Sequence, residues 1–256
     1  MKHGDFSDLA ENYSKYRPGY SNFVVEAACS VVIQAFADAD VVLAADVGAG
    51  TGIFSRMLLK NNLKVSAVEP NDEMRSFGEQ DCKGDIPFVA GTAEATGLAD
   101  SSVHFVSMAS SFHWPDFGLA VNEFKRILVP GGYFLSIWNT RAIEKDPFTV
   151  DVEDYLKKLV PELKRRSSGR SEFCDSLHDR LMDCGVFEDV VYLEGFHTEE
   201  QSIDRYLGLW ESVNDVRVQA GAERFGSFLQ YIKDASRGMS HVNAHYQTRA
   251  WLAKAK

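Results

Sequence analysis

Short runs of apolar residues alternate along the chain with stretches of helical periodicity. The runs are nearly continuous and end at acidic, polar or glycine-rich positions, which is typical of strands buried on both faces of a parallel sheet. They cover residues 41–46, 64–69, 87–90, 103–108 and 133–138. Between them, apolar residues recur every three or four positions, which predicts helices over about 21–37, 53–59, 72–77 and 119–128.

Strand and helix therefore alternate five times in the first 140 residues. Parallel strands require crossover connections, and these are almost always right-handed, so the pattern predicts a doubly wound α/β sheet with helices on both faces. No internal repeat or low-complexity tract interrupts the chain. We therefore expect a single domain over residues 1–256.

The two ends depart from this alternation. A short helix over about 6–13 and a turn at Pro18-Gly19 are expected at the start. After Asn139 the pattern predicts helices over about 147–160 and 176–184, a helix opened by Thr198, another over about 223–233, and strands near 190–196 and 241–252. The segment 198–240 is long for a connection between strands, and we expect it to be a helical insertion that forms a lid over the substrate.

Composition and charge narrow the possible partners. The 256 residues are 45% hydrophobic with a formal net charge of -10, and such a chain repels phosphate backbones, so nucleic acid is not expected as a partner. No apolar leader and no apolar run long enough to span a membrane is evident. The four cysteines form no C-x-x-C pair, which favours reduced thiols and a cytoplasmic location.

Histidine spacing does not indicate a metal site. His241 and His245 are four residues apart, a spacing that suits a metal only on a helix. Because they fall on an expected strand, we predict no metal.

Asp46 ends the first expected strand and is followed by glycines at 48, 50 and 52. Glycine adopts positive φ at little cost, and its missing Cβ lets the backbone approach a ligand at the N-terminus of the next helix. The spacing G-x-G-x-G differs from the G-x-G-x-x-G of dinucleotide sites. It matches the shorter loop used for S-adenosylmethionine.

Glu69 ends the second expected strand, 23 residues after Asp46 (69 − 46 = 23). At the carboxyl edge of the sheet, beside the glycine turn, its carboxylate can accept hydrogen bonds from both hydroxyls of a ribose. The alternative is a helix-capping acid. The loop and the acid together predict a ligand that contains adenosine.

The sequence resembles the class I S-adenosylmethionine-dependent methyltransferases, particularly the trans-aconitate-methyltransferase-like branch that acts on small molecules. The resemblance covers most of the first 140 residues, and beyond them it extends only to the layout of elements. Its motifs are Tyr13-x-x-Tyr16-Arg17-Pro18-x-Tyr20, Asp46-Val47-Gly48-Ala49-Gly50-Thr51-Gly52, Val68-Glu69-Pro70-Asn71-x-x-Met74, Gly91-Thr92-Ala93-Glu94, Phe112-His113-Trp114 and Leu128-Val129-Pro130-Gly131-Gly132. One departure is Ala49, at a position that often holds cysteine in the family.

The resemblance implies a seven-stranded Rossmann-like sheet of order 3-2-1-4-5-7-6, whose last strand, near 241–252, is antiparallel. It also implies that residues 1–20 form a cap over the cofactor, S-adenosyl-L-methionine. The residues that would bind this cofactor are Tyr13, Arg17, Asp46, Gly48, Ala49, Gly50, Gly52, Glu69, Pro70, Asn71, Met74, Thr92, Ala93, Glu94 and Ser110.

Individual roles follow from the same resemblance. Asp46 and the glycine loop would face the methionine part of the cofactor, and Glu69 would hold the ribose. Asn71 and Met74 would flank the adenine, while Ala93 and Glu94 would lie at its edge, with Glu94 near the amino group. Ser110 and Ser111 would approach the sulfonium. Tyr13 and Arg17 would reach the carboxylate, which a guanidinium can grip with two hydrogen bonds.

The implied reaction is in-line displacement of the methyl group by a small-molecule acceptor, which depends mainly on placing the acceptor. His113 is the candidate general base, and the alternative is that it packs with Trp114 to shape the loop. Asn139 could orient the acceptor. Other functions stay open: an enzyme that cleaves or cyclises the cofactor without methylation, a non-catalytic sensor, or a nicotinamide-dependent oxidoreductase. The sequence leaves open a monomer or a homodimer.

Overall fold

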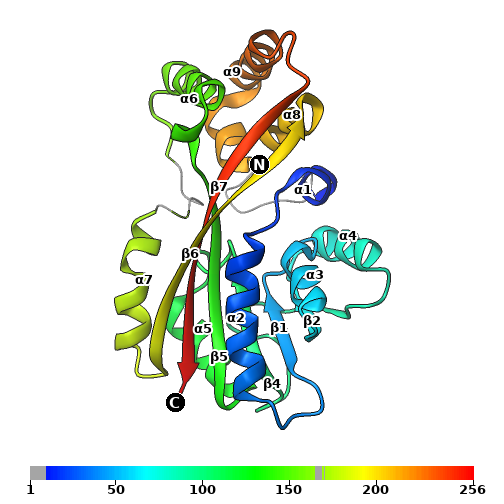
Figure 1. Cartoon of the computed structure of the whole chain (residues 1–256), viewed down its shortest axis with the longest axis vertical. Coiled ribbons are helices and arrows are strands. Elements are labelled where there is room, and N and C mark those ends of the chain that lie inside the picture. The colour runs from blue at the N-terminus through cyan, green and yellow to red at the C-terminus, as the bar shows by residue number, and fades with distance from the viewer. Residues whose placement is uncertain (1–9, 165–168, 170) are drawn as a thin grey trace.

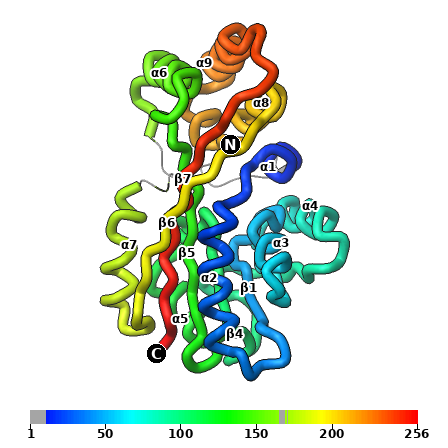
Figure 2. The backbone as a smooth tube through the Cα atoms, viewed as in Figure 1, coloured from blue at the N-terminus to red at the C-terminus, as the bar shows by residue number. Residues whose placement is uncertain are grey.

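The computed structural model describes residues 10–164, 169 and 171–256. Seven strands form one mixed sheet in the order β3-β2-β1-β4-β5-β7-β6 (Figures 1 and 2). Strands β1 to β5 pair in parallel, whereas β7 is antiparallel to both of its neighbours. The predicted fold and strand order are therefore confirmed. The strands are β1 Leu43–Val47, β2 Lys64–Val68, β3 Phe88–Val89, β4 Val103–Ala109, β5 Leu128–Arg141, β6 Phe187–Ser202 and β7 His241–Ala255.

Helices cover both faces of this sheet. On one face, the apolar side chains of α2 and α3 pack into one core cluster with the inward residues of the central strands, and α4 adds Cys82. On the other face, α5 and α7 build a second cluster around Phe124 and Phe134. The helices are α1 Ala10–Tyr16, α2 Asn22–Ala35, α3 Ile53–Lys60, α4 Asp72–Cys82, α5 Phe117–Ile127, α6 Pro147–Leu159, α7 Glu172–Asp183, α8 Ile203–Glu211 and α9 Asn214–Ala235.

The topology creates a crevice at the carboxyl ends of β1 and β4. The chain leaves β1 toward β2 on one side, whereas β4 lies on its other side, so the strand order reverses at this pair. Ligands of open α/β sheets bind where this reversal separates two crossover connections. Asp46 stands opposite Ser107 in the pairing of β1 with β4, which places the glycine loop at the edge of this crevice.

A helical lobe built from α6, α8 and α9 lies beyond the carboxyl end of β5, at the top of Figure 1. It has its own core, in which the rings of Trp210 and Phe228 meet edge to face at 4.7 Å. The ends of the long strands β6 and β7 run up to this lobe (Figure 2). The lobe is therefore held by the sheet but packed around separate apolar side chains.

Three predicted boundaries were wrong. No helix begins at Thr198, because β6 continues to Ser202 and pairs with β7 throughout. The hydroxyl of Ser202 instead caps α8, accepting a hydrogen bond from the Arg205 backbone N–H. The insertion is therefore shorter than 198–240. The last helix begins at Asn214 rather than 223, with a kink at Gly221, where φ is 73°.

The first helix also differs from the prediction. It continues to Tyr16, three residues beyond the predicted end at 13. The predicted start at residue 6, and the part of the cap that precedes residue 10, lie outside the described residues.

Candidate active site

The glycine loop has the backbone that its sequence predicts. Gly48, Gly50 and Gly52 have φ values of 67°, 57° and 75°, a left-handed region that other residues adopt at a cost. The N–H groups of Gly48 and Ala49 both donate to the carbonyl of Val68 on β2, at 2.8 and 3.1 Å. These bonds fold the loop tightly over the end of β1.

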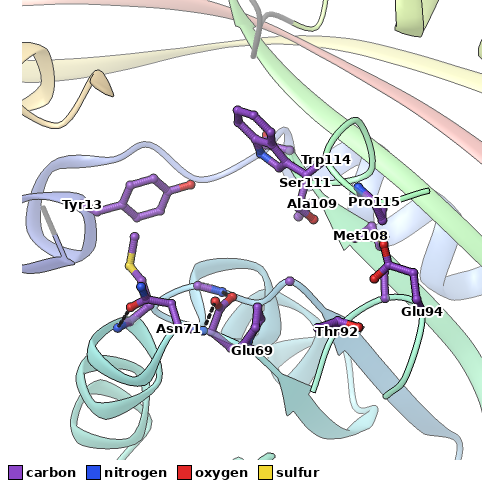
Figure 3. Close-up of a pocket in the computed structure, with 16 residues that line it drawn as sticks. Tyr13, Glu69, Asn71, Thr92, Glu94, Met108, Ala109, Ser111, Trp114 and Pro115 are labelled. Carbon is purple, nitrogen blue, oxygen red and sulfur yellow. Dashed lines mark hydrogen bonds between the residues drawn. The ribbon is translucent and has the colours of Figure 1, made fainter. Parts of the chain in front are cut away.

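A cleft of about 330 Å³ opens beside this loop (Figure 3), a volume within the usual range of small-molecule sites. Tyr13 and Trp114 lie on the side opposite Glu69 and Asn71, and Thr92 and Glu94 lie at one end. The cleft is lined by Tyr13, Gly48, Gly50, Glu69, Pro70, Asn71, Met74, Thr92, Ala93, Glu94, Met108, Ala109, Ser110, Ser111, Trp114 and Pro115.

Glu69 is the acidic group nearest the glycine loop in this lining. Its Oε2 accepts a hydrogen bond from the Gly50 N–H at 2.8 Å, and its Oε1 accepts one from the Asn71 N–H at 2.9 Å. Burial of the side chain, which is 7% exposed, raises the pKa of Glu69 despite these bonds. A carboxylate offers about four acceptor sites. Two therefore stay available to a ligand, one on each oxygen.

Asp46 lies behind the loop rather than in the lining. It is fully buried, and its carboxylate accepts hydrogen bonds from the hydroxyls of Ser55 at 2.6 Å and Ser107 at 2.8 Å. Burial raises the pKa of Asp46 to about 6 in spite of these two bonds. The side chain ties β1 to α3 and β4, and so supports the loop from beneath.

The far end of the cleft combines apolar side chains with polar groups at the edge. Met74 and Ala93 are buried there. The Asn71 side chain caps α4 by accepting a hydrogen bond from the Met74 N–H at 2.9 Å, which holds the methionine against the cleft. Glu94 accepts a hydrogen bond from the Asp116 N–H at 3.0 Å. This end suits a flat aromatic group with a polar rim.

The opposite wall comes from the N-terminal segment. A Cβ added to Gly50 would lie 3.9 Å from Cε1 of Tyr13, an ordinary van der Waals distance, so the tyrosine ring faces the glycine loop directly. The hydroxyls of Tyr20 and Ser110 are hydrogen-bonded at 2.9 Å. This bond fixes the segment to the end of β4, so the cleft is bounded on a side that the sheet alone would leave open.

The structure brings together all but four of the predicted cofactor residues. Asp46, Ala49 and Gly52 belong to the loop and its support but do not line the cleft. Arg17 faces elsewhere, because its Nε and one terminal amino group donate to the hydroxyl and carbonyl oxygens of Ser212, each at 3.0 Å. Arg17 thus lies outside the cleft lining, and its predicted role at the cofactor carboxylate stays a prediction.

Arg17 and Asn139 instead line a second cavity of about 350 Å³, at the junction of the helical lobe and the sheet. Asn139 donates to the Gly19 carbonyl at 2.8 Å and accepts from the Thr248 hydroxyl at 3.0 Å. The amide thus holds the N-terminal segment against β5 and β7. Its predicted role in orienting an acceptor stays a prediction.

His113 does not line the cleft either. Its ring lies between Trp114 and Trp138, at centroid distances of 4.5 and 6.2 Å, and neither ring nitrogen has a hydrogen-bond partner. Burial lowers the pKa of His113 to about 4, which makes the imidazole a weak base. The geometry favours the packing alternative over the catalytic one.

The predicted cofactor residues lacked part of the wall formed by the end of β4 and the residues after it: Met108, Ala109, Trp114 and Pro115. Ser111, which was expected near the sulfonium, does line the cleft. The signal that could have identified the missing residues is position, because β4 neighbours β1 at the reversal of strand order. Every residue just past its carboxyl end is therefore near the loop. Ser111 is the closest, since a Cβ on Gly48 would lie 2.8 Å from its Oγ.

Two further searches cover only the residues that the structure describes. Within that part of the chain, no three histidine, cysteine or acidic side chains are placed to hold a metal ion. Among the same residues, no helix has both the length and the apolarity needed to cross a bilayer.

Comparison with known proteins adds independent evidence for this region. Residues 45–136 match the model of the methyltransferase domain. An uncharacterised methyltransferase of Mycobacterium tuberculosis is 40% identical over 96 residues, which are 38% of this chain and 39% of that protein. A ubiquinone/menaquinone biosynthesis C-methyltransferase of Rubrivivax gelatinosus is 30% identical over 105 residues, 40% of this chain and 42% of that protein. The chain thus spans about two fifths of the length of the curated relatives it matches.

A solved structure resembles the fold over nearly the whole chain. The protein comes from Anaeromyxobacter dehalogenans and carries the provisional name of a type II methyltransferase; the TM-score is 0.66 at 22% identity, with 94% of this chain and 98% of that chain covered. At this identity the likeness bears on the fold alone. The family-model match, by contrast, covers residues 45–136, which hold the glycine loop, Glu69 and the end of β4.

Proposed function

We propose that this chain, whose residues 45–136 match the methyltransferase domain, is a class I enzyme that transfers the methyl group of S-adenosylmethionine to a small-molecule acceptor. The observation that carries the proposal is the position of Glu69. Its carboxylate lies in the cleft beside the Gly50 N–H and keeps one acceptor site free on each oxygen.

The residues of the cleft fit the cofactor that the family implies. Two ribose hydroxyls match the two free acceptor sites of Glu69, and the apolar surface of Met74 and Ala93 suits an adenine. Gly48 and Gly50 have no Cβ atoms, so the backbone of the loop can approach a ligand closely. Tyr13 and Ser110 would then face the methionine end.

Bound S-adenosylmethionine would supply a methyl group on a sulfonium, whose departure as a neutral thioether needs no metal. The protein's contribution is then placement, because orienting two reactants can account for much of a rate enhancement. The glycine loop and Glu69 would fix one reactant. The wall after β4 and the N-terminal segment would exclude water and align the acceptor in line with the bond that breaks.

Calorimetric titration tests this function directly. We expect S-adenosylhomocysteine to bind the purified chain and NADH not to bind, because the loop lacks the dinucleotide spacing. Failure of S-adenosylhomocysteine to bind would sink the proposal. Product analysis after incubation with S-adenosylmethionine and an acceptor extract then separates methyl transfer from cofactor cleavage: the first yields S-adenosylhomocysteine and a methylated acceptor, the second methylthioadenosine.

The finer assignment to the trans-aconitate-methyltransferase-like branch stays a prediction, since the matched relatives do not separate that branch from others. We also propose a cytoplasmic enzyme.

A further inference from the structure

The charged side chains that line the cleft are acidic. Glu69 and Glu94 contribute carboxylates, and none of the lining residues in the described part of the chain is a lysine, arginine or histidine. Arg17 lies outside the lining, where its guanidinium donates hydrogen bonds to Ser212. Walls of low dielectric strengthen the field of such charges. The cleft therefore favours a cationic ligand and disfavours an anionic one.

Trp114 is fixed at the cleft with much of its side chain uncovered. It lines the cleft and is 45% exposed. Its backbone N–H donates to the Ser111 carbonyl at 3.1 Å, and the Ser111 hydroxyl donates to the Val47 carbonyl at the end of β1 at 3.3 Å. These bonds hold the turn that carries the indole beside the glycine loop. A held indole that is half open offers its face to a ligand.

The ring that packs on this indole is uncharged. The centroid of His113 lies 4.5 Å from that of Trp114, and burial lowers the pKa of His113 to about 4, so the imidazole is neutral near neutral pH. Tyr13 lies on the same side of the cleft as Trp114, opposite Glu69 (Figure 3). A ligand between these groups would have aromatic rings on one side and a carboxylate on the other. The face of an indole attracts a cation that comes within about 6 Å of its centre.

Methyl transfer to an amine would keep a positive charge in such a cleft. The ammonium form first gives up a proton to water, and the nitrogen lone pair then forms the bond to the methyl carbon. The carbon–sulfur bond breaks, and its electron pair passes to sulfur, which leaves neutral S-adenosylhomocysteine. The charge of the sulfonium thus becomes the charge of the methylated ammonium. Attack by an anion would instead cancel this charge and leave Glu69 and Glu94 without a cation.

We propose, on the basis of the proposed function, that the methyl acceptor is an organic amine that binds in the cleft with its ammonium group against the face of Trp114. The carboxylates of Glu69 and Glu94 supply the compensating charge. The reaction is then an N-methylation. Such an acceptor differs from the carboxylate for which the trans-aconitate-methyltransferase-like branch is named.

Three fluorinated probes of similar size test the proposal by ¹⁹F NMR with S-adenosylhomocysteine present. They are the cationic 4-fluorobenzylamine, the neutral 4-fluorobenzyl alcohol and the anionic 4-fluorophenylacetate. We expect the amine to bind about tenfold or more tightly than the other two. Equal binding of amine and alcohol, binding of the carboxylate at least as tight as that of the amine, or no binding of the amine would each overturn the proposal.

Variants assign the preference to the indole. Trp114→Leu keeps an apolar side chain without the ring, so it should weaken binding of the amine by about fivefold or more and that of the alcohol by less. Trp114→Phe should lose less, because it keeps an aromatic face. Phe196→Leu, which removes an exposed ring of β6, should change nothing. Equal losses for amine and alcohol in Trp114→Leu would contradict the role of the indole. Thermal unfolding checks that Trp114→Leu folds, and Trp114→Phe decides the matter where it does not.

Calorimetry keeps this proposal distinct from the proposed function. If S-adenosylhomocysteine binds the wild type but the amine has no advantage over the other probes, the acceptor assignment is wrong and the function stands. If Trp114→Leu weakens binding of S-adenosylhomocysteine and spares the amine, Trp114 holds the cofactor and the acceptor assignment is again wrong. If the wild type binds no S-adenosylhomocysteine, the function itself fails.

Discussion

The cleft and the second cavity are built in different ways. The cleft is walled mainly by the ends of β1, β2, β3 and β4 and the segments that follow them, with one residue of the N-terminal segment opposite. The second cavity is walled by side chains from the N-terminal segment, β5, α6 and the end of the α8 region. Backbone conformation therefore governs the first site, whereas the packing of a separate helical lobe governs the second. Changes at one site should spare the other.

The largest effect is expected from Gly48→Val. This substitution forces a β-branched residue to a φ of 67° and brings its Cβ within 2.8 Å of Ser111 Oγ. We expect affinity for S-adenosylhomocysteine to fall about 100-fold, close to 3 kcal/mol, in calorimetry. Gly84→Val is the matched control, because Gly84 has a φ of 85° with nothing within 4 Å of a Cβ. Equal losses of affinity in the two variants would show that the short distance between Gly48 and Ser111 does not matter for binding.

Removal of the Glu69 carboxylate is the next strongest change. We expect Glu69→Ala to weaken S-adenosylhomocysteine binding by about tenfold or more, because a hydrogen bond to a charged group contributes roughly 1.5–3 kcal/mol. Glu73→Ala, at an acid in the first turn of α4, should leave the affinity unchanged. Equal affinities of Glu69→Ala and Glu73→Ala would remove the Glu69 carboxylate from the binding site.

Burial of Asp46 beneath the glycine loop should make the stability of the protein depend on pH. Its pKa of about 6 in the folded protein lies above the ordinary aspartate pKa of 3.8, so its contribution to stability is full below pH 3.8 and is lost as the pH rises through about 6. Relative to Asp46→Asn, the wild type should lose about 1–2 kcal/mol of unfolding free energy between about pH 5 and pH 8. Urea denaturation at both pH values measures this. A difference that does not change with pH would contradict the raised pKa.

The smallest expected effect tests whether the packing of the helical lobe on α1 influences cofactor binding in the cleft. A Cβ on Gly208 of α8 would lie 2.4 Å from the ring of Tyr16 on α1. We expect Gly208→Ala to displace α1, which carries Tyr13, and to weaken S-adenosylhomocysteine binding by about three- to fivefold, below 1 kcal/mol. Gly226→Ala in α9, where a Cβ meets nothing, should not weaken it. If Gly208→Ala binds S-adenosylhomocysteine as tightly as the wild type does, the packing of the lobe on α1 does not affect cofactor binding.

The fold and most of the cleft were predictable because their signals are local. Asp46, the glycines and Glu69 lie at strand ends, where a change from apolar to polar residues marks both the element and the site. The wall around the end of β4 was predicted only in part. Ser110 and Ser111 were expected near the sulfonium, whereas Met108, Ala109 and Pro115 have apolar side chains that give no sign of a site. They line the cleft only because β4 pairs with β1.

The second cavity could not be predicted, for a different physical reason. Arg17 has a guanidinium suited to a carboxylate in either site, and only the packing of α1 on α8 turns it toward the lobe. The helix predicted to begin at Thr198, with Glu199 and Glu200 in its first turn, was wrong for a similar reason. Its two glutamates suit a first helical turn, but pairing with β7 satisfies the backbone of that stretch as a strand.

The most direct test of the central claim is a crystal structure with S-adenosylhomocysteine bound. We expect both ribose hydroxyls within about 3 Å of the two carboxylate oxygens of Glu69, with the adenine against Met74 and Ala93. A ligand whose ribose lies away from Glu69, or a Glu69 side chain turned out of the cleft, would contradict the account.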